Sequence, residues 1–445
     1  MMALLYICTI ILLFSASIFV HELGHYLAAR ALGFVVDTFS IGMGPAIWKR
    51  RVGETTWQIG GIPFGGFVAL PQMDPNAFLE TTHNDKKREL PRLPPWKKIV
   101  VAVAGATGNI IFAFLLAVVV WLVGKPSSLQ EQNAIIGYVA TNSPALNLGV
   151  APGDEILTIH QRPVRNWNDI LESVALAPEG NIIADVRAAD QTVRTLELAT
   201  RKHPLGVRTL DGIEGMDPCL VAAVMPGSGA EAAQLQAGDQ ILQVNGLRVF
   251  SRGHLSQLVE EFSPQPMQLT VLRAGKNIQA TVSAHYDAEL KRNLIGIQFN
   301  TLSDLDFTTR AHPTPWEQIR AHATALFSFL RALSRPSTSG AAAGAVGGPV
   351  MILYMLWLML KASFILGVWF TGLLNVQLAI INLLPIPILD GGHVVMNLWE
   401  WVTRRPAPAR LVHALANLFA LLFITLFVVL VFRDSARFIA PIFRP

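Results

Sequence analysis

Two histidines four residues apart flank a glutamate in a long apolar segment near the N-terminus. The run is His21-Glu22-Leu23-Gly24-His25. On a helix, a spacing of four places both imidazoles on one face, where they can share a zinc ion. Glu22 stands close enough to act as a general base toward a water molecule at that ion. The residues therefore indicate zinc-dependent hydrolysis, and the alternative is a polar contact between helices.

A catalytic zinc needs three protein ligands, so one more must come from elsewhere in the chain. The segment from Asn382 to Gly392 contains a single carboxylate, Asp390, in an otherwise apolar stretch and after two prolines that break a helix. If the first and third apolar spans end on the same side of a membrane, His25 and Asp390 reach the same depth. We therefore expect Asp390 to be the third ligand. The alternative is a carboxylate at a helix end that faces water.

The composition is that of a membrane protein. Of 445 residues, 52% are hydrophobic and 15% are charged, whereas about a quarter of a soluble domain is charged. Runs of roughly 20 apolar residues can cross a bilayer. We predict a first transmembrane helix within 1–35, a second at 99–124, a third within 363–392 and a fourth at 412–432. The apolar stretch 350–360 is shorter, and we interpret it as interfacial.

Basic residues cluster in residues 36–98, which we interpret as a loop after the first span. They are Lys49, Arg50, Arg51, Lys86, Lys87, Arg88, Arg92, Lys97 and Lys98, and no basic residue precedes the span. Positively charged loops favour the cytoplasmic side of a membrane. We therefore expect the N-terminus outside and the zinc site near the cytoplasmic side. The net charge of +4 gives no indication of nucleic-acid binding.

The region between the second and third spans contains an internal repeat. Residues 151–157 (Ala-Pro-Gly-Asp-Glu-Ile-Leu) recur at 236–242 as Gln-Ala-Gly-Asp-Gln-Ile-Leu. Two copies of one small domain follow, at 131–211 and 216–300, each with turns, β-branched strands and a helical pattern. These features resemble PDZ domains, in which a glycine-containing loop captures an extended peptide. The corresponding glycines are Gly206 and Gly296. The alternative is that the domains act only as a steric lid.

Glycines recur through residues 36–70, which alternate between apolar and polar positions. Glycine lets another backbone approach closely, and open-edged backbone is tolerated at membrane depth only when it is buried in protein or lines a cavity. We predict a β-hairpin beside the metal site, and its free edge would pair with an unwound substrate. The alternative is a hairpin on the cytoplasmic surface. The expected substrate contacts are Gln58, Ile59, Gly60, Gly61 and Ile62.

A further amphipathic segment is predicted within residues 312–360. Apolar residues recur there at helical spacing, with arginines between them. They are Trp316, Ile319, Ala323, Leu326, Phe327, Leu330 and Leu333. This pattern is typical of a helix on a membrane surface. It would serve as an interfacial anchor or couple the repeat domains to the membrane core.

Together these features resemble the site-2 protease family of intramembrane zinc metalloproteases, specifically the regulator-of-sigma-E type of Gram-negative bacteria. The motifs are His21-Glu22-x-x-His25, Leu389-Asp390-Gly391 and the tandem domains, and residues 39–44 and 62–67 match the family's re-entrant hairpin. The resemblance implies a polytopic α-helical membrane protein with about four transmembrane helices, a membrane re-entrant β-hairpin and two inserted PDZ-like α+β domains. It also implies the bacterial inner membrane, with the N-terminus and PDZ-like domains in the periplasm.

The same resemblance implies the substrates and two of their contacts. Single-pass membrane proteins would be cleaved within the bilayer, for example a pre-trimmed anti-sigma factor or a remnant signal peptide, in regulated intramembrane proteolysis during envelope stress. The family often has two asparagines before its Leu-Asp-Gly motif. Asn382 matches the second, and Gln377 stands where the first is expected. Gln can still donate and accept hydrogen bonds, so both are expected to contact substrate.

Two other functions remain open from the sequence. A noncatalytic peptide-binding scaffold would use the repeat domains without needing His21, Glu22 or Asp390. A metal transporter would use ionisable groups along a pathway, and transporters usually show internal symmetry among their spans, which this sequence does not. Measurement of zinc content together with cleavage of a membrane substrate separates the three functions.

Overall fold

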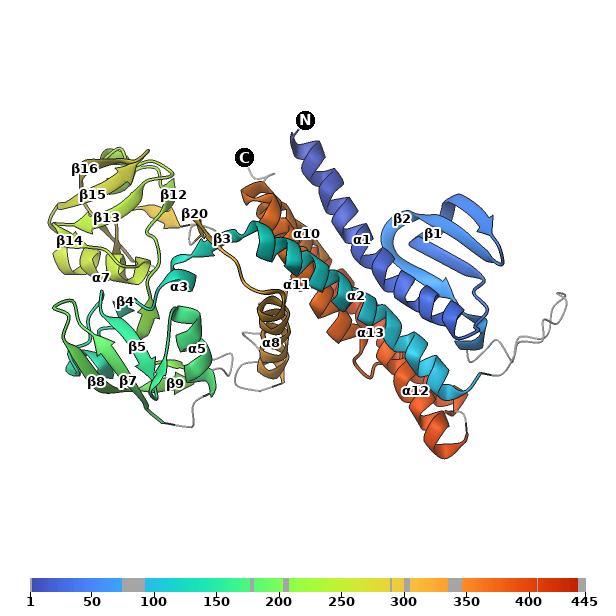
Figure 1. Ribbon diagram of the computed structural model, residues 1–445. Coiled ribbons are helices and arrows are strands. Elements are labelled where there is room, and N and C mark those ends of the chain that lie inside the picture. The colour runs from blue at the N-terminus through green and yellow to red at the C-terminus, as the bar shows by residue number, and fades with distance from the viewer. Residues whose placement is uncertain are drawn as a thin grey trace. The chain divides into compact units, whose positions relative to one another are not determined.

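The chain divides into two compact units in the computed structural model, which describes residues 2–73, 93–176, 180–202, 208–288, 290–299, 305–334, 346–405 and 407–438. The first unit comprises Met1–Lys125, His312–Leu330 and Ala343–Pro445. The second comprises Pro126–Ala311 and Arg331–Ala342. Figure 1 shows the long helices of the first unit and the sheets of the second.

The first unit is built mainly from helices. They are α1 (Met2–Ala31), α2 (Pro95–Val123), α8 (Pro315–Leu333), α10 (Pro349–Ala362), α11 (Phe364–Asn382), α12 (Asp390–Thr403) and α13 (Ala409–Phe438). In the described part of the chain, four segments are long and apolar enough to cross a membrane: Leu4–Ala31, Pro95–Val123, Phe364–Asn382 and Arg410–Ala436. They lie at the four places where spans were predicted.

The apolar stretch before the third span forms a separate helix. α10 ends at Ala362, and the extended backbone of Ser363 separates it from α11. With 14 residues, α10 is about 21 Å long, which is shorter than the roughly 30 Å hydrocarbon core of a bilayer. Its first turn is held by α13, because Asp434 Oδ2 accepts a hydrogen bond from the backbone nitrogen of Met351 at 2.9 Å. The interfacial position of this stretch stays a prediction.

Glycines allow α1 and α2 to cross in close contact. A Cβ atom on Gly24 would lie 2.3 Å from the carbonyl oxygen of Ala104, and one on Gly108 would lie 2.7 Å from that of Val20. Small residues at such crossings let helix backbones approach in a membrane, where lipid contributes no hydrophobic drive for association. The crossing therefore places the backbone of α2 directly against the turn of α1 that contains His21 and His25.

Two long bent strands, β1 (Thr38–Val52) and β2 (Thr55–Ala69), form the predicted hairpin. Residues 48–52 pair with 55–59 next to the turn. Residues 38–41 then pair with 56–59 on one side and with 66–69 on the other. The result is a four-segment layer in the order 66–69, 38–41, 56–59 and 48–52.

The hairpin packs on the second half of α1 (Figure 1). Phe39 of β1 is fully buried, and its ring centroid lies 5.6 Å from that of Tyr26 on α1 and 4.4 Å from that of Trp57 on β2. This aromatic cluster fixes the layer to the helix that contains the two histidines. The packing favours a hairpin beside the metal site over one detached on the surface.

The second unit contains two repeat domains with the same sheet order. In the first, β6 (Arg162–Pro163), β5 (Glu155–Ile159), β7 (Ile182–Arg187) and β8 (Val193–Leu198) lie side by side, with α5 (Trp167–Leu176). In the second, β14 (Leu247–Arg248), β13 (Gln240–Val244), β15 (Met267–Arg273) and β16 (Lys276–Val282) repeat that order, with α7 (Arg252–Phe262). Each domain has its own hydrophobic core. The sequence repeat is thus also a structural repeat.

Short elements complete the description. They are a 3-10 turn at Pro71–Met73, β3 (Lys125–Ser128), α3 (Leu129–Gln132), β4 (Ile136–Val139), α4 (Pro144–Asn147), β9 (Thr200–Lys202), β10 (Arg208–Leu210), β11 (Ile213–Gly215), β12 (Val221–Val224), α6 (Gly229–Ala232), β17 (His285–Asp287), β18 (Arg292–Leu294), β19 (Ile297–Phe299) and β20 (Leu305–Ala311). Strand β11 pairs with β4, and β19 pairs with β12, so each domain also closes through a second small sheet.

The predicted amphipathic helix α8 turns a polar face toward the membrane helices. Gln318 and His322 are buried, and Gln318 Nε2 donates to the carbonyl oxygen of Ala117 on α2 at 3.0 Å. Burial, together with the positive charge of Lys125, lowers the pKa of His322 to about 4, so its ring is neutral near pH 7. Trp316 is 71% exposed. Its contact with a membrane surface stays a prediction.

Candidate metal centre

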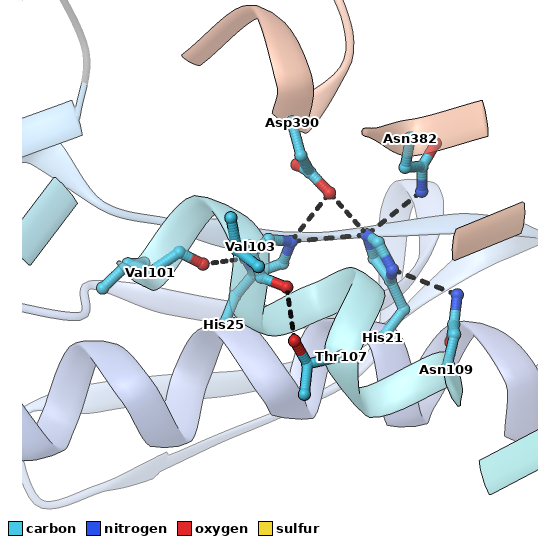
Figure 2. Close-up of polar contacts among 8 residues, drawn as sticks. All are labelled: His21, His25, Val101, Val103, Thr107, Asn109, Asn382 and Asp390. Carbon is cyan, nitrogen blue, oxygen red and sulfur yellow. Dashed lines mark hydrogen bonds and ion pairs between the residues drawn. The ribbon is translucent and has the colours of Figure 1, made fainter. Parts of the chain in front are cut away.

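Three side chains that the sequence singled out as ligands converge in the first unit. Figure 2 shows His21 and His25 of α1 pointing toward Asp390, the first residue of α12. Their ligand atoms all lie within 4.8 Å of one another. The exposed fraction is 8% for His21 and 9% for His25. The centre is therefore enclosed by protein, in a helix long and apolar enough to span a membrane.

The turn after α11 brings Asp390 to the histidines because it is built around two glycines. A Cβ atom on Gly391 would lie 2.1 Å from the carbonyl oxygen of Leu384, and one on Gly392 would lie 2.4 Å from that of Ile386. Only glycine lets the first turn of α12 fold back over residues 383–387 so tightly. The two glycines after Asp390 thus allow a turn that directs its carboxylate toward His21 and His25.

The donor atoms have the spacing expected around a tetrahedral metal ion. Nε2 of His21 lies 3.3 Å from Nε2 of His25, and Oδ2 of Asp390 lies 3.2 Å and 3.4 Å from the two nitrogens. Ligand atoms held about 2.1 Å from a tetrahedral zinc are about 3.4 Å from one another. The contacts of the buried Oδ2 atom with the two nitrogens lack hydrogen-bond geometry, and no other described residue donates to it. Two imidazoles and one carboxylate in this arrangement fit zinc.

Helix α2 contacts the Nδ1 atom of each imidazole ring and so orients both rings (Figure 2). The Nδ1 atom of His25 donates to the carbonyl oxygen of Val101 at 2.8 Å, which leaves Nε2 free to bind a metal. This approach requires Gly105, because a Cβ atom there would lie 2.2 Å from Nε2 of His25. The Nδ1 atom of His21 lies 3.2 Å from the side-chain amide nitrogen of Asn109.

Glu22 lies beside the ligands and next to the edge of the hairpin. It is 8% exposed. A Cβ atom on Gly66 of β2 would lie 2.9 Å from Cγ of Glu22 and 2.8 Å from the carbonyl oxygen of Ser40. The backbone at Gly66 therefore rests against the glutamate. Among the described residues, no further strand pairs with residues 66–69, so this segment is a free edge next to Glu22.

The predicted substrate edge at residues 58–62 stays a prediction, and the strand pairing argues against it at Gln58 and Ile59. Both sides of Gln58 and Ile59 are occupied, because residues 56–59 pair with 38–41 and with 48–52. The side chain of Gln58 donates to Oγ of Ser40 at 3.2 Å. Gly60 and Ile62 also pair with β1, and Gly61 lies between them. The sequence indicated a hairpin. Because the strands bend, residues 38–41 pair on both sides, and residues 66–69 form the free edge near the centre.

The structure brings Asn382 to the centre and leaves Gln377 away from it. The amide nitrogen of Asn382 lies 3.4 Å from Nε2 of His21, whereas the side chain of Gln377 makes no hydrogen bond with any described residue. A different asparagine, Asn375, is fully buried and donates to Oγ of Ser17 at 2.9 Å. Residues 375 and 382 are seven apart and share a helix face, whereas 377 lies about 140° away from 382. Position 377 therefore does not share the helix face that carries Asn382.

Asn109 is a residue of the site that sequence reasoning missed. It is a polar residue within an apolar span, which is a functional candidate in its own right. The residues Val101, Gly105 and Asn109 follow one another at intervals of four and so form one stripe along α2.

Of the two glycines predicted to lie in peptide-binding loops, Gly206 and Gly296, the structure describes only the second. Gly206 lies outside the described residues. Gly296 has a φ of +82°, and a Cβ atom there would lie 2.1 Å from that of Ser228. It lines a cavity of about 1000 Å³ between α7 and the segment 291–299. Residues of the first repeat domain, such as Tyr138, also line this cavity.

Comparisons with known proteins cover nearly the whole chain. A family model described as peptidase family M50 matches residues 9–427. A protein of Xylella fastidiosa, named for a proposed zinc metalloprotease activity, is 29% identical over 415 residues, which cover 89% of this chain and 91% of that protein. Proteins with the same description from Neisseria meningitidis and Vibrio cholerae are each 26% identical, and each alignment covers 94% of this chain and at least 95% of the relative.

Solved structures match only part of the chain. The PDZ domain of an SdrC-like protein from Listeria monocytogenes is 21% identical to this chain and has a TM-score of 0.17. The match covers 19% of this chain and 88% of that domain.

Proposed function

This chain belongs to peptidase family M50, whose model matches residues 9–427, and from that premise we propose that it is an endopeptidase that cleaves membrane-embedded segments. The chain is a zinc metalloprotease, because it belongs to this family and its relatives are named for a proposed zinc metalloprotease activity. The observation that carries the intramembrane site is the position of His21, Glu22 and His25 within a helix apolar enough to span the bilayer. We assign His21, His25 and Asp390 as the zinc ligands.

The chemistry is divided between the ion and the side chains around it. Zinc in such a site acts as a Lewis acid, which activates water and polarises a peptide carbonyl. Glu22 is the general base that takes the proton of the attacking water and later gives it to the leaving nitrogen. The amide of Asn382, close to Nε2 of His21, is placed to donate to the carbonyl oxygen of the substrate as negative charge develops on it.

A transmembrane substrate must unwind before its peptide bond can be attacked, because a helix keeps its carbonyls in internal hydrogen bonds. We assign the free edge at residues 66–69 as the place where the unwound segment adds as a strand. Its support is the contact between the backbone at Gly66 and the side chain of Glu22. A strand paired there would lie beside the general base.

A methyl group on Gly66 is therefore expected to impair cleavage. In Gly66→Ala the new Cβ atom meets the carbonyl oxygen of Ser40 at 2.8 Å and Glu22 at 2.9 Å, so the edge must move away from the base. A displacement of about 1 Å costs on the order of a hundredfold in turnover, while zinc content holds. Turnover of a single-span substrate and zinc content of the purified protein check this.

Gly61→Ala is the matched comparison on the same strand. A Cβ atom there would lie 3.4 Å from its closest neighbour, the carbonyl oxygen of Pro45, so the layer accommodates it. If strand addition occurs at residues 66–69, Gly61→Ala retains turnover. Equal loss in both variants would return the substrate edge to residues 58–62.

The remaining assignments follow the family resemblance. We propose single-pass substrates such as a pre-trimmed anti-sigma factor or remnant signal peptides, in the inner membrane of a bacterium. The N-terminus and two PDZ-like domains would lie in the periplasm, with the active site near the cytoplasmic side. The cavity beside Gly296 supports peptide binding by the second domain, and a steric lid is the alternative role.

Metal removal tests the proposed function. The full chain, reconstituted in lipid with a single-span test substrate, is expected to cleave it, to lose cleavage when zinc is chelated, and to regain it when zinc is restored. A scaffold would show no cleavage in any condition, and a transporter would move zinc across the bilayer without cleaving. Cleavage that persists without metal would contradict the proposal.

A further inference from the structure

We propose that Asn109 is a positioning residue of the metal centre: its amide oxygen accepts the Nδ1 hydrogen of His21 and so holds the ring in the tautomer that offers Nε2 to the ion. The inference rests on the proposed zinc centre. It concerns a residue of α2 that is not one of the three ligands, makes no hydrogen bond to Asp390 and faces the Nδ1 side of the His21 ring (Figure 2).

The first observation is an amide oxygen left without a partner. Asn109 is 0% exposed, and its nitrogen lies 3.2 Å from Nδ1 of His21, whereas its Oδ1 atom has no hydrogen-bond partner among the described residues. A buried polar atom of this kind needs an explanation. The oxygen and nitrogen of an asparagine amide are assigned from the hydrogen-bond network. Rotating the amide by half a turn exchanges them, so that the oxygen faces Nδ1 of His21 and the nitrogen takes the position without a described partner.

The second observation is the chemistry that each orientation allows. If the amide nitrogen donates to Nδ1 of His21, the ring hydrogen must lie on Nε2, the atom that faces His25 and Asp390. A metal could not bind that nitrogen. If instead the amide oxygen accepts from Nδ1, Nε2 keeps its lone pair. Only the second orientation is compatible with a ligand set of His21, His25 and Asp390.

His25 provides an internal comparison. Its Nδ1 atom faces the carbonyl oxygen of Val101, an atom that can only accept, and this contact sets the tautomer needed for metal binding. Val101, Gly105 and Asn109 lie on one stripe of α2. The helix therefore supplies an acceptor behind each ring, from its backbone for His25 and from a side chain for His21. Asn382 cannot do this for His21, because it faces Nε2.

Zinc affinity of the full-length chain tests the inference directly. Asn109→Leu keeps approximate size and removes the acceptor, and we expect the apparent zinc dissociation constant, measured by competition with a chromogenic chelator, to rise about 10–100-fold. Asn109→Asp keeps an acceptor and removes the donor, so its affinity should equal or exceed that of the wild type. This pair distinguishes which amide atom faces the ring.

Asn375→Leu is the matched control. Asn375 is also fully buried among the apolar helices and also has an amide oxygen without a described partner, but it bonds Ser17 and Thr371, not a ligand. If loss of any buried amide disturbed the bundle, Asn375→Leu would weaken zinc binding as much as Asn109→Leu does. We expect it to bind zinc as the wild type does.

Two results would overturn the inference. Wild-type affinity in a folded Asn109→Leu protein would show that the contact is only packing. An affinity in Asn109→Asp below that of the wild type would show that a donor faces the ring, and this arm decides the question even if Asn109→Leu does not fold. A wild-type protein that holds no zinc would instead contradict the proposed function, which is a separate outcome.

Discussion

Replacing Glu22 by Gln is expected to leave zinc binding near the wild-type level and to lower turnover of a single-span substrate by at least about a hundredfold, the scale of general acid–base catalysis. Gln keeps the shape of the side chain but cannot accept the proton of the attacking water. The ligand atoms of His21, His25 and Asp390 form the three-membered cluster without Glu22, so the metal should remain. Metal analysis and a cleavage assay on the same purified protein check both parts.

Glu400→Gln is the matched control for this change. It makes the same chemical substitution on α12, where Glu400 pairs with Lys98 at 3.4 Å and is partly exposed to solvent. Such a pair contributes about 0–1 kcal/mol to stability, so turnover should hold. Zinc lost from Glu22→Gln would show that Glu22 is a ligand. Full turnover in that variant would assign the base elsewhere.

The principal parts of the metal centre could be predicted because they depend on spacing and on membrane sidedness. His21 and His25 share a helix face at any depth, and the two crossings by the second and third spans bring the end of the third span back to the side where the first ends. Asp390 was then a single carboxylate in an apolar stretch. Two glycines after it, which the sequence also shows, allow the tight turn that aims it.

The residues behind the rings could not be predicted from spacing alone, because they depend on how α2 is rotated against α1. That rotation is set by backbone contact at Gly24 and Gly108. Once it is known, Val101 and Asn109 follow as partners of the two imidazoles. Gln377 was placed at the site by the motif of the family, whereas helical periodicity puts position 377 about 140° away from Asn382.

The free edge of the hairpin could not be predicted from the sequence. Alternation and glycines indicated two strands, but a strand pattern does not say which edge stays free when the strands bend. Here residues 38–41 accept partners on both sides, so that 56–59 become internal and 66–69 become an edge. Gly66 is evident in the sequence, yet its closeness to Glu22 depends on the packing of Phe39 against Tyr26.

Adding one methyl group at Gly105 is expected to disable the metal centre. In Gly105→Ala the Cβ atom would lie 2.2 Å from Nε2 of His25 and 2.7 Å from its Cε1 atom, so the ring must swing away. It would lose its hydrogen bond to Val101 and its position as a ligand together. Loss of a ring partner alone costs about 10–100-fold in metal affinity, so displacement of the ligand itself should cost at least about a hundredfold, and turnover should fall with zinc content.

Gly372→Ala is the control that separates this local clash from a general effect of alanine in a membrane helix. Gly372 lies inside α11, and a Cβ atom there would be 3.9 Å from its closest neighbours, Ala113 and Leu116, which is ordinary contact. Both variants add the same group to buried helix interiors, so both should retain helical content by circular dichroism. Only Gly105→Ala should lose zinc in the chelator competition. A Gly105→Ala protein with wild-type zinc affinity and turnover would mean that His25 does not lie over Gly105 in the working enzyme, and that α2 orients the ligands in another way.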